Sequence, residues 1–157
     1  MNLHLLTARR RDRQQRGLQA FMVALQQAAK ELPSQVRMLD PETSVRIEQS
    51  FSTFVQESLA TGMLVRDTEL SWDQVSDRLR QQVGLWEEAE TVVYLSHHED
   101  FLFRLPFFLF AENARSLIEF DGDTVYAVSD DLQRGCGIDI YTSEIVNLRR
   151  YTVDTWG

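Results

Sequence analysis

The sequence predicts one α+β domain over residues 1–157, with three N-terminal helices followed by a mainly antiparallel β-sheet. Apolar residues recur every three or four positions up to about residue 90, and after it they alternate with polar residues. This change of period indicates helices first and strands second. The chain has 157 residues, 43% of them hydrophobic, which suits one domain with its own core. Helices that precede strands, rather than alternating with them, indicate α+β.

The first predicted helix covers residues 7–32. Pro33 is expected to end it, because proline cannot continue a helix. Residues 9–16 are polar on all sides, so residues 1–16 form either a solvated start of the helix or a frayed basic arm. The apolar residues of the helix form a single stripe, which consists of Leu18, Phe21, Met22, Leu25, Ala28, Ala29 and Leu32.

Two further helices have recognisable ends. The second is predicted to begin after Asp40, which can cap it and is followed by a proline, the residue that suits the first helical position. Gly62 is a plausible C-terminal cap for this helix. The third is predicted to begin at Ser71, where Gln74 completes a capping box, and to run to about Glu88.

The second half of the chain begins with two predicted strands. Residues 91–95 and 101–105 are rich in β-branched and aromatic side chains, and a polar turn at 97–100 could join them. Pro106 then interrupts the apolar run. We expect a bend there, followed by a short strand or turn, although the proline also suits the start of a short helix over 107–113.

A tight hairpin is predicted around the Asp-Gly pair at 121–122. Strand-like runs flank this pair at 117–120 and 123–128, and Asp-Gly favours the positive φ angles of a two-residue hairpin turn. Alternating apolar and polar residues predict two more antiparallel strands, at 137–141 and 151–156.

Few residues suggest catalytic chemistry. His97, His98, Glu99 and Asp100 are potential metal ligands, but neighbours in sequence point in different directions, so a hydrogen-bonded turn is expected. Cys136 lies between two glycines and is expected to be a small buried residue rather than a nucleophile. We therefore expect no catalytic residue, no metal site and no cofactor.

Five phenylalanines lie within residues 101–110. They are expected to form part of the core between sheet and helices. The alternative is an exposed patch that binds a partner.

Charge is distributed unevenly along the chain. Residues 1–40 have a balance of +4 and residues 41–157 a balance of −12, which gives the net charge of −8. The acidic body is not expected to bind nucleic acid directly, because phosphate contacts need Lys and Arg. No apolar stretch approaches the length of a membrane span, so we expect a cytoplasmic protein that does not contact a membrane.

The chain resembles the immunity proteins of bacterial polymorphic-toxin and contact-dependent inhibition systems. The resemblance covers its size, its acidity, the order of helices and sheet, and a C-terminal strand over residues 151–157. It implies a cytoplasmic inhibitor, not an enzyme, that binds and blocks a cognate toxin domain, often a basic nuclease. An acidic surface could occupy the positive cleft of such a nuclease.

Acidic residues at the helix-to-sheet corner and in the strand connections are the predicted partner-binding residues. They are Glu87, Glu88, Glu90, Glu99, Asp100, Asp121, Asp123, Asp130 and Asp131. Two alternatives stay open: an acidic nucleic-acid mimic directed at a nuclease complex, and a small enzyme or ligand-binding domain whose site is not recognisable in the sequence.

Overall fold

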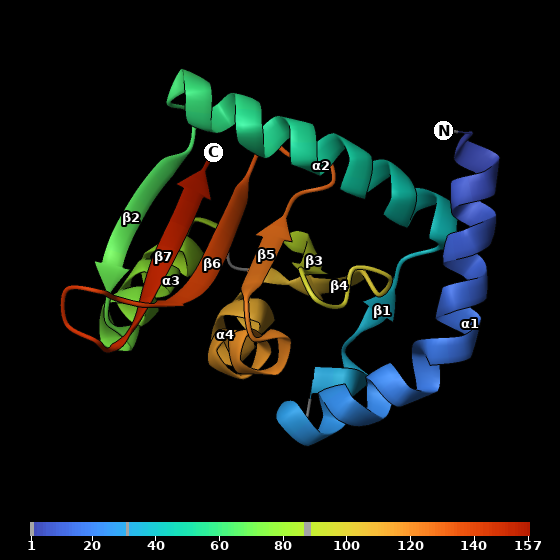
Figure 1. Cartoon of the computed structure of the whole chain (residues 1–157), viewed down its shortest axis with the longest axis horizontal. Helices are drawn as coiled ribbons and strands as arrows, with labels where there is room; N and C mark the ends of the chain where they lie inside the picture. The colour runs from blue at the N-terminus through green and yellow to red at the C-terminus, as the bar shows by residue number, and fades with distance from the viewer. Residues whose placement is uncertain (1, 31, 87–88) are drawn as a thin grey trace.

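A computed structural model describes residues 2–30, 32–86 and 89–157 and confirms the α+β fold (Figure 1). Within these residues, seven strands form one antiparallel sheet in the order β1-β4-β3-β5-β6-β7-β2. The elements are, in chain order, α1 (Leu3–Ala28), the 3₁₀ helix η1 (Leu32–Ser34), β1 (Arg37–Met38), α2 (Pro41–Thr61), β2 (Val65–Leu70), α3 (Trp72–Trp86), β3 (Glu90–Leu95), β4 (Phe103–Pro106), α4 (Phe107–Asp121), β5 (Thr124–Val128), β6 (Gly135–Thr142) and β7 (Arg149–Trp156).

The sheet separates two hydrophobic clusters, because successive side chains of a strand point to opposite faces. On one face, residues such as Val93 and Ile138 pack against α3, α4 and the C-terminal half of α1. On the other face, Val92 and Trp156 pack in a smaller cluster with Phe51 of α2. Figure 1 shows α2 crossing one end of the central strands, with α3 and α4 on the opposite side of the sheet.

Both predicted ends of α2 and the predicted start of α3 are confirmed, whereas the predicted end of α3, at about Glu88, lies outside the described residues. The Asp40 carboxylate accepts the backbone N–H of Thr43 at 2.9 Å, and Gly62 adopts a left-handed conformation (φ 73°) after the last turn. The capping box of α3 is present, since Ser71 N–H donates to Gln74 Oε1 at 2.8 Å and Gln74 N–H donates to Ser71 Oγ at 3.3 Å.

Helix α1 is longer at its start and shorter at its end than predicted. It begins at Leu3, so most of the segment 1–16 is helical rather than a frayed arm, and Arg10 within it is only 3% exposed. It ends at Ala28, after which the chain turns and brings Leu32 into the core. None of the helices in the described residues combines the length and hydropathy that a bilayer crossing requires.

The bend and short strand expected after Pro106 are wrong. Strand β4 ends at Pro106, and the long helix α4 begins with the next residue. Helical spacing along α4 directs one row of side chains at the sheet. The members of this row, all fully buried, are Phe107, Phe110, Ala114, Leu117 and Ile118.

The hairpin predicted at 121–122 is also wrong. Residues 117–121 are the last turn of α4, and Gly122 (φ 83°) is its C-terminal cap, with its N–H donating to Ile118 O. Only the second predicted strand, at 124–128, exists as β5. Asp-Gly can end a helix as readily as it turns a hairpin, because glycine adopts a left-handed conformation without steric cost in either setting.

The two edge strands, β1 and β2, have no counterpart in the sequence-based prediction. The side chains of β2 are mostly exposed, and its pairing with β7 is interrupted where Glu69 has a positive φ of 57°. An edge strand buries neither face fully, so it lacks the alternation by which strands are recognised. The predicted strands at 91–95, 101–105, 137–141 and 151–156 are confirmed with small shifts of their ends.

The aromatic run at 101–110 is mainly core, as expected. Phe103, Phe107 and Phe110 are fully buried. Phe101 packs against the main cluster while remaining partly exposed, and Phe108 is also partly exposed.

Candidate functional site

The structure places the predicted acidic residues at opposite ends of the central strands. Strands β3 and β5 are antiparallel, with Leu95 opposite Val125 and Val92 opposite Val128. One group lies where β3 ends and β5 begins; its members are Glu99, Asp100, Asp121 and Asp123. The other lies where β3 begins and β5 ends; its members are Glu90, Asp130 and Asp131. Glu87 and Glu88 lie outside the described residues.

Asp121 is buried and holds the β3–β4 loop against the end of α4. Its carboxylate accepts the hydroxyl of Ser96 at 2.8 Å, the N–H of His97 at 2.9 Å and the N–H of Thr124 at 3.2 Å. Nδ1 of His98 lies 3.2 Å from the same carboxylate. This confirms that residues 97–100 belong to a turn held by side-chain hydrogen bonds, and it gives Asp121 a structural role.

Asp100 belongs to a partly buried ion-pair cluster that joins α1, α2 and the β3–β4 loop. Arg10 pairs with Glu48 of α2, its Nε lies 3.5 Å from Asp100, and it donates to the backbone oxygen of Glu99. Arg13 also pairs with Asp100, at 2.7 Å. Burial raises the pKa of the Glu48 carboxyl, and the charge of Arg10 opposes this shift.

The acidic residues at the other end of β3 and β5 also have partners. Asp130 pairs with Arg104, and Glu90 pairs with an arginine of β1. The hydroxyl of Ser129 donates to Asp131 at 2.7 Å and lowers the pKa of that carboxyl. Exposed ion pairs of this kind contribute little to stability, so they position these carboxylates without preventing other contacts.

A row of polar residues crosses five strands on the sheet face where α2 lies. Residues that pair across antiparallel strands share one face. The pairing places Tyr94 opposite Tyr126, Tyr126 opposite Gly137, Gly137 opposite Asp154, and Asp154 opposite Arg66. The row therefore runs from β3 through β5, β6 and β7 to β2.

Tyr94 and Tyr126 form the centre of this row. Both rings contact Phe51 of α2, with centroid separations of 5.6 and 4.8 Å. The Tyr126 ring lies over Gly137, where any Cβ atom would overlap it. Both side chains are partly buried, and neither hydroxyl has a hydrogen-bond partner among the described residues. The rings are thus held in place while the hydroxyls stay available.

Carboxylates surround the tyrosines. Asp154 is buried and accepts two hydrogen bonds from Arg66, at 2.7 and 2.8 Å. Asp139 lies in the next row, where it accepts the hydroxyl of Thr124 at 3.0 Å. Burial raises the pKa of Asp139, and the charge of Asp123 adds to this effect.

We call this surface the tyrosine–carboxylate face. Five carboxylates lie on it or at its margin, and Arg10 and Arg66 offset part of their charge. Burial, together with neighbouring carboxylates, raises the pKa of Tyr94 and of Tyr126 to about 12, so both hydroxyls are protonated at neutral pH and can donate. The face comprises Glu48, Tyr94, Glu99, Asp123, Tyr126, Asp139 and Asp154.

Cys136 lies in the core, whereas His97 and His98 lie in the β3–β4 loop. Complete burial raises the pKa of Cys136 to about 12, which keeps its thiol protonated. His97 and His98 both direct Nδ1 at Asp121, and within the described ranges neither contacts Cys136. No three His, Cys, Asp or Glu residues in the described part of the chain are grouped to hold a metal ion. On the tyrosine–carboxylate face, the hydroxyls of Tyr94 and Tyr126 can donate hydrogen bonds, and the carboxylates can accept hydrogen bonds from a cationic partner.

Glu99 and Asp123 belong both to the predicted set and to this face, whereas the other five residues of the face were missed. Alternation within single strands puts Asp139 and Asp154 on the polar side of their own strands. That signal cannot bring them together, because the register between strands is not encoded in one strand.

Comparison of the chain with protein-family models, with curated proteins and with solved structures returned no match. Its function is therefore inferred from its own fold and surface.

Proposed function

We propose that this protein is an immunity-type inhibitor that binds a basic protein domain, such as a nuclease toxin, and blocks it by covering its active cleft. The observation that carries this proposal is the pair Tyr94 and Tyr126 among five carboxylates. Packing holds the two rings, and their hydroxyls have no hydrogen-bond partner in the part of the chain that the structure describes. Tyrosine is enriched at the centres of protein interfaces, because it supplies a large contact area and a hydrogen bond at low entropic cost.

The charge of the face suits a partner that binds phosphate. A nuclease holds its substrate with Lys and Arg, so its cleft is positive. Carboxylates on a fold of net charge −8 would be attracted to that cleft and would accelerate association. Contact with the cleft would then exclude the nucleic acid.

The carboxylates of the face should contribute in different ways. Glu99 is exposed, and Asp123 is about half exposed, so both should act mainly on the rate of association. Asp139 is partly buried and lies close to the Tyr126 ring. When a carboxylate is fully buried against a basic partner, truncating its side chain typically costs about 2–5 kcal/mol of binding free energy.

The test compares two variants of equal charge. The double variant Glu99→Gln with Asp123→Asn removes two of the five carboxylate charges of the face. The control variant, Glu57→Gln with Asp73→Asn, removes two exposed carboxylate charges on α2 and α3. Proteins are captured from the source cells at low salt. We expect one of them to bind the wild type and the variant with changes on α2 and α3, but not the variant with changes at Glu99 and Asp123. That protein is then purified and its activity is titrated with the wild type.

We expect activity to fall to zero at one molecule of this protein per molecule of partner. A partner that keeps its activity when saturated would overturn the proposal. So would capture that both double variants weaken equally, or the absence of any protein that depends on the face.

A further inference from the structure

The β6–β7 loop, residues 143–148, exposes three large apolar side chains although its backbone is well anchored. Ser143 is buried; its hydroxyl donates to Glu69 at 2.7 Å and accepts the N–H of Ile145 at 3.3 Å. The backbone N–H of Ser143 donates to Leu148 O at 2.9 Å. Exposed apolar clusters typically mark interaction sites. The exposed fractions are 83% for Ile145, 43% for Val146 and 57% for Leu148.

The same chain has an apolar groove of about 530 Å³ between α3 and α4. It lies on the helical side of the sheet, opposite the tyrosine–carboxylate face. A cavity of this size can accept several apolar side chains. Its apolar lining consists of Trp72, Leu79, Val83, Phe108 and Ala111.

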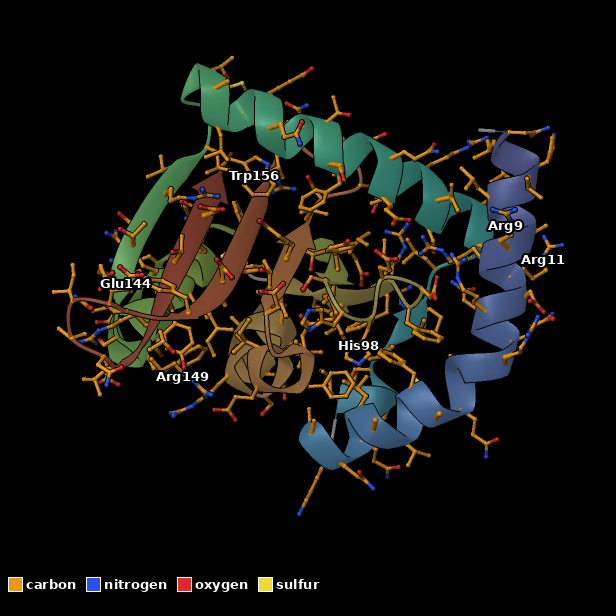
Figure 2. The ribbon with its side chains drawn as sticks, viewed as in Figure 1. Arg9, Arg11, His98, Glu144, Arg149 and Trp156 are labelled. Atoms are coloured by element: carbon orange, nitrogen blue, oxygen red, sulfur yellow. The ribbon has the colours of Figure 1, made fainter. Side chains whose placement is uncertain are left out.

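The charges beside the loop complement those beside the groove. Glu144 lies in the loop and Arg149 follows it directly, and neither has an ion-pair partner in the described parts of the chain (Figure 2). Glu112, Arg80 and Arg115 line the groove. Among the described residues, the ion pairs of the two arginines are exposed and lie within their own helices, at 2.9 and 3.4 Å. The Arg115 guanidinium also lies over the Trp72 ring, 5.6 Å from its centroid. Such ion pairs are weak and could exchange for a partner's carboxylate at little cost.

We propose that the chain forms a symmetric homodimer in which the β6–β7 loop of each copy occupies the α3–α4 groove of the other. Loop and groove lie next to each other, as a two-fold contact requires, since the Trp72 ring at the end of the groove packs on Tyr151 of β7 with centroids 5.1 Å apart. Glu144 then faces Arg80 and Arg115 of the second copy, and Arg149 faces its Glu112.

The experiment measures self-association by analytical ultracentrifugation over a wide range of concentrations. The loop variant Ile145→Ser with Val146→Ser and the groove variant Ala111→Arg should each weaken the dimer by at least about tenfold. Mixing the two variants should restore part of the association, because each mixed dimer has one intact loop and one intact groove. Leu85→Ser, which changes an apolar residue of α3 that is 71% exposed and outside the groove, should have no effect.

A wild-type chain that stays monomeric at all concentrations would overturn the homodimer, as would dimers that both variants leave intact. Circular dichroism and thermal unfolding confirm that each variant is folded. Binding to vesicles of anionic lipid that requires Ile145, without self-association, would assign the loop to a membrane instead. The dimer and the inhibitor proposal can fail separately, because they use opposite faces of the sheet.

Discussion

Arg10 shows how one buried charge determines the position of a helix. It is the point where α1 meets both α2 and the β3–β4 loop, through Glu48, Asp100 and the backbone of Glu99. Burying a charge is unfavourable unless it is paired, so the burial of Arg10 favours this position of α1 only while those partners are present.

Replacing Arg10 with Met should lower the free energy of unfolding by about 1.5–3 kcal/mol, the range for hydrogen bonds to charged groups. Arg9→Met is the matched control, because Arg9 is exposed on the same helix (Figure 2) and should change stability by less than about 0.5 kcal/mol. Urea unfolding measures both values. Equal effects of the two substitutions would show that the cluster does not stabilise α1.

Asp139 should destabilise the protein when it is ionised. Burial raises the pKa of Asp139 in the folded state, so folding favours the protonated form. The contribution of Asp139 to the free energy of unfolding is therefore largest below the unfolded pKa of about 3.9, and it is lost as the pH rises through the folded pKa. Asp139→Asn stays neutral and can still accept from Thr124. The variant should therefore melt at a higher temperature than the wild type at pH 7, with the difference vanishing near pH 3. A difference that grows on acidification would contradict this sign.

At the scale of elements, α4 illustrates how one sequence pattern suits two structures. Residues 117–120 are mostly apolar and precede an Asp-Gly pair, which favours a strand and a turn. The row that begins at Phe107 and continues every three or four residues to Ile118 also suits a helix, and all of its members are buried. The structure has a helix here, because a helix places this whole row of side chains against the sheet and a strand would not.

Two glycines, one at the end of α4 and one within α3, should respond to alanine in opposite directions. Gly122 caps α4 with a φ of 83°, so Gly122→Ala should cost about 1–2 kcal/mol, the penalty of a left-handed backbone for an L-residue. Gly84 lies within α3, where an added Cβ atom would meet no other atom within 4 Å, so Gly84→Ala should stabilise by about 0.5–1 kcal/mol. Chemical unfolding of both variants is the measurement. Stabilisation by Gly122→Ala would argue against the helix cap.

For the whole molecule, the charge distribution leads to a kinetic prediction for the proposed complex. The association rate of wild type with its captured partner should fall as salt rises, because screening shortens the range of attraction. At low salt, Glu99→Gln with Asp123→Asn should slow association by up to about tenfold and reduce its salt dependence, since steering as a whole contributes about 10–10³-fold. Stopped-flow fluorescence would measure these rates. A rate that does not depend on salt in either protein would exclude steering by this face.

The sequence by itself determined those features that depend on residues close together in the chain. The cap at Asp40, the left-handed Gly62 and the box of Ser71 with Gln74 all join groups within a few positions, so their chemistry is local. The α+β class follows in the same way, because the period of the apolar residues is a property of each segment.

Only the tertiary structure decided how those segments meet. The role of the Asp-Gly pair depended on whether residues 107–121 pack as a helix on the sheet, which no local preference settles. The row from Tyr94 to Arg66 exists because five strands pair in one register, and a slip by one residue would turn each strand's side chains to the other face. The burial of Arg10 likewise depends on α2 and the β3–β4 loop, which are distant in sequence. Long-range packing and register, which no single segment encodes, therefore determined the candidate site.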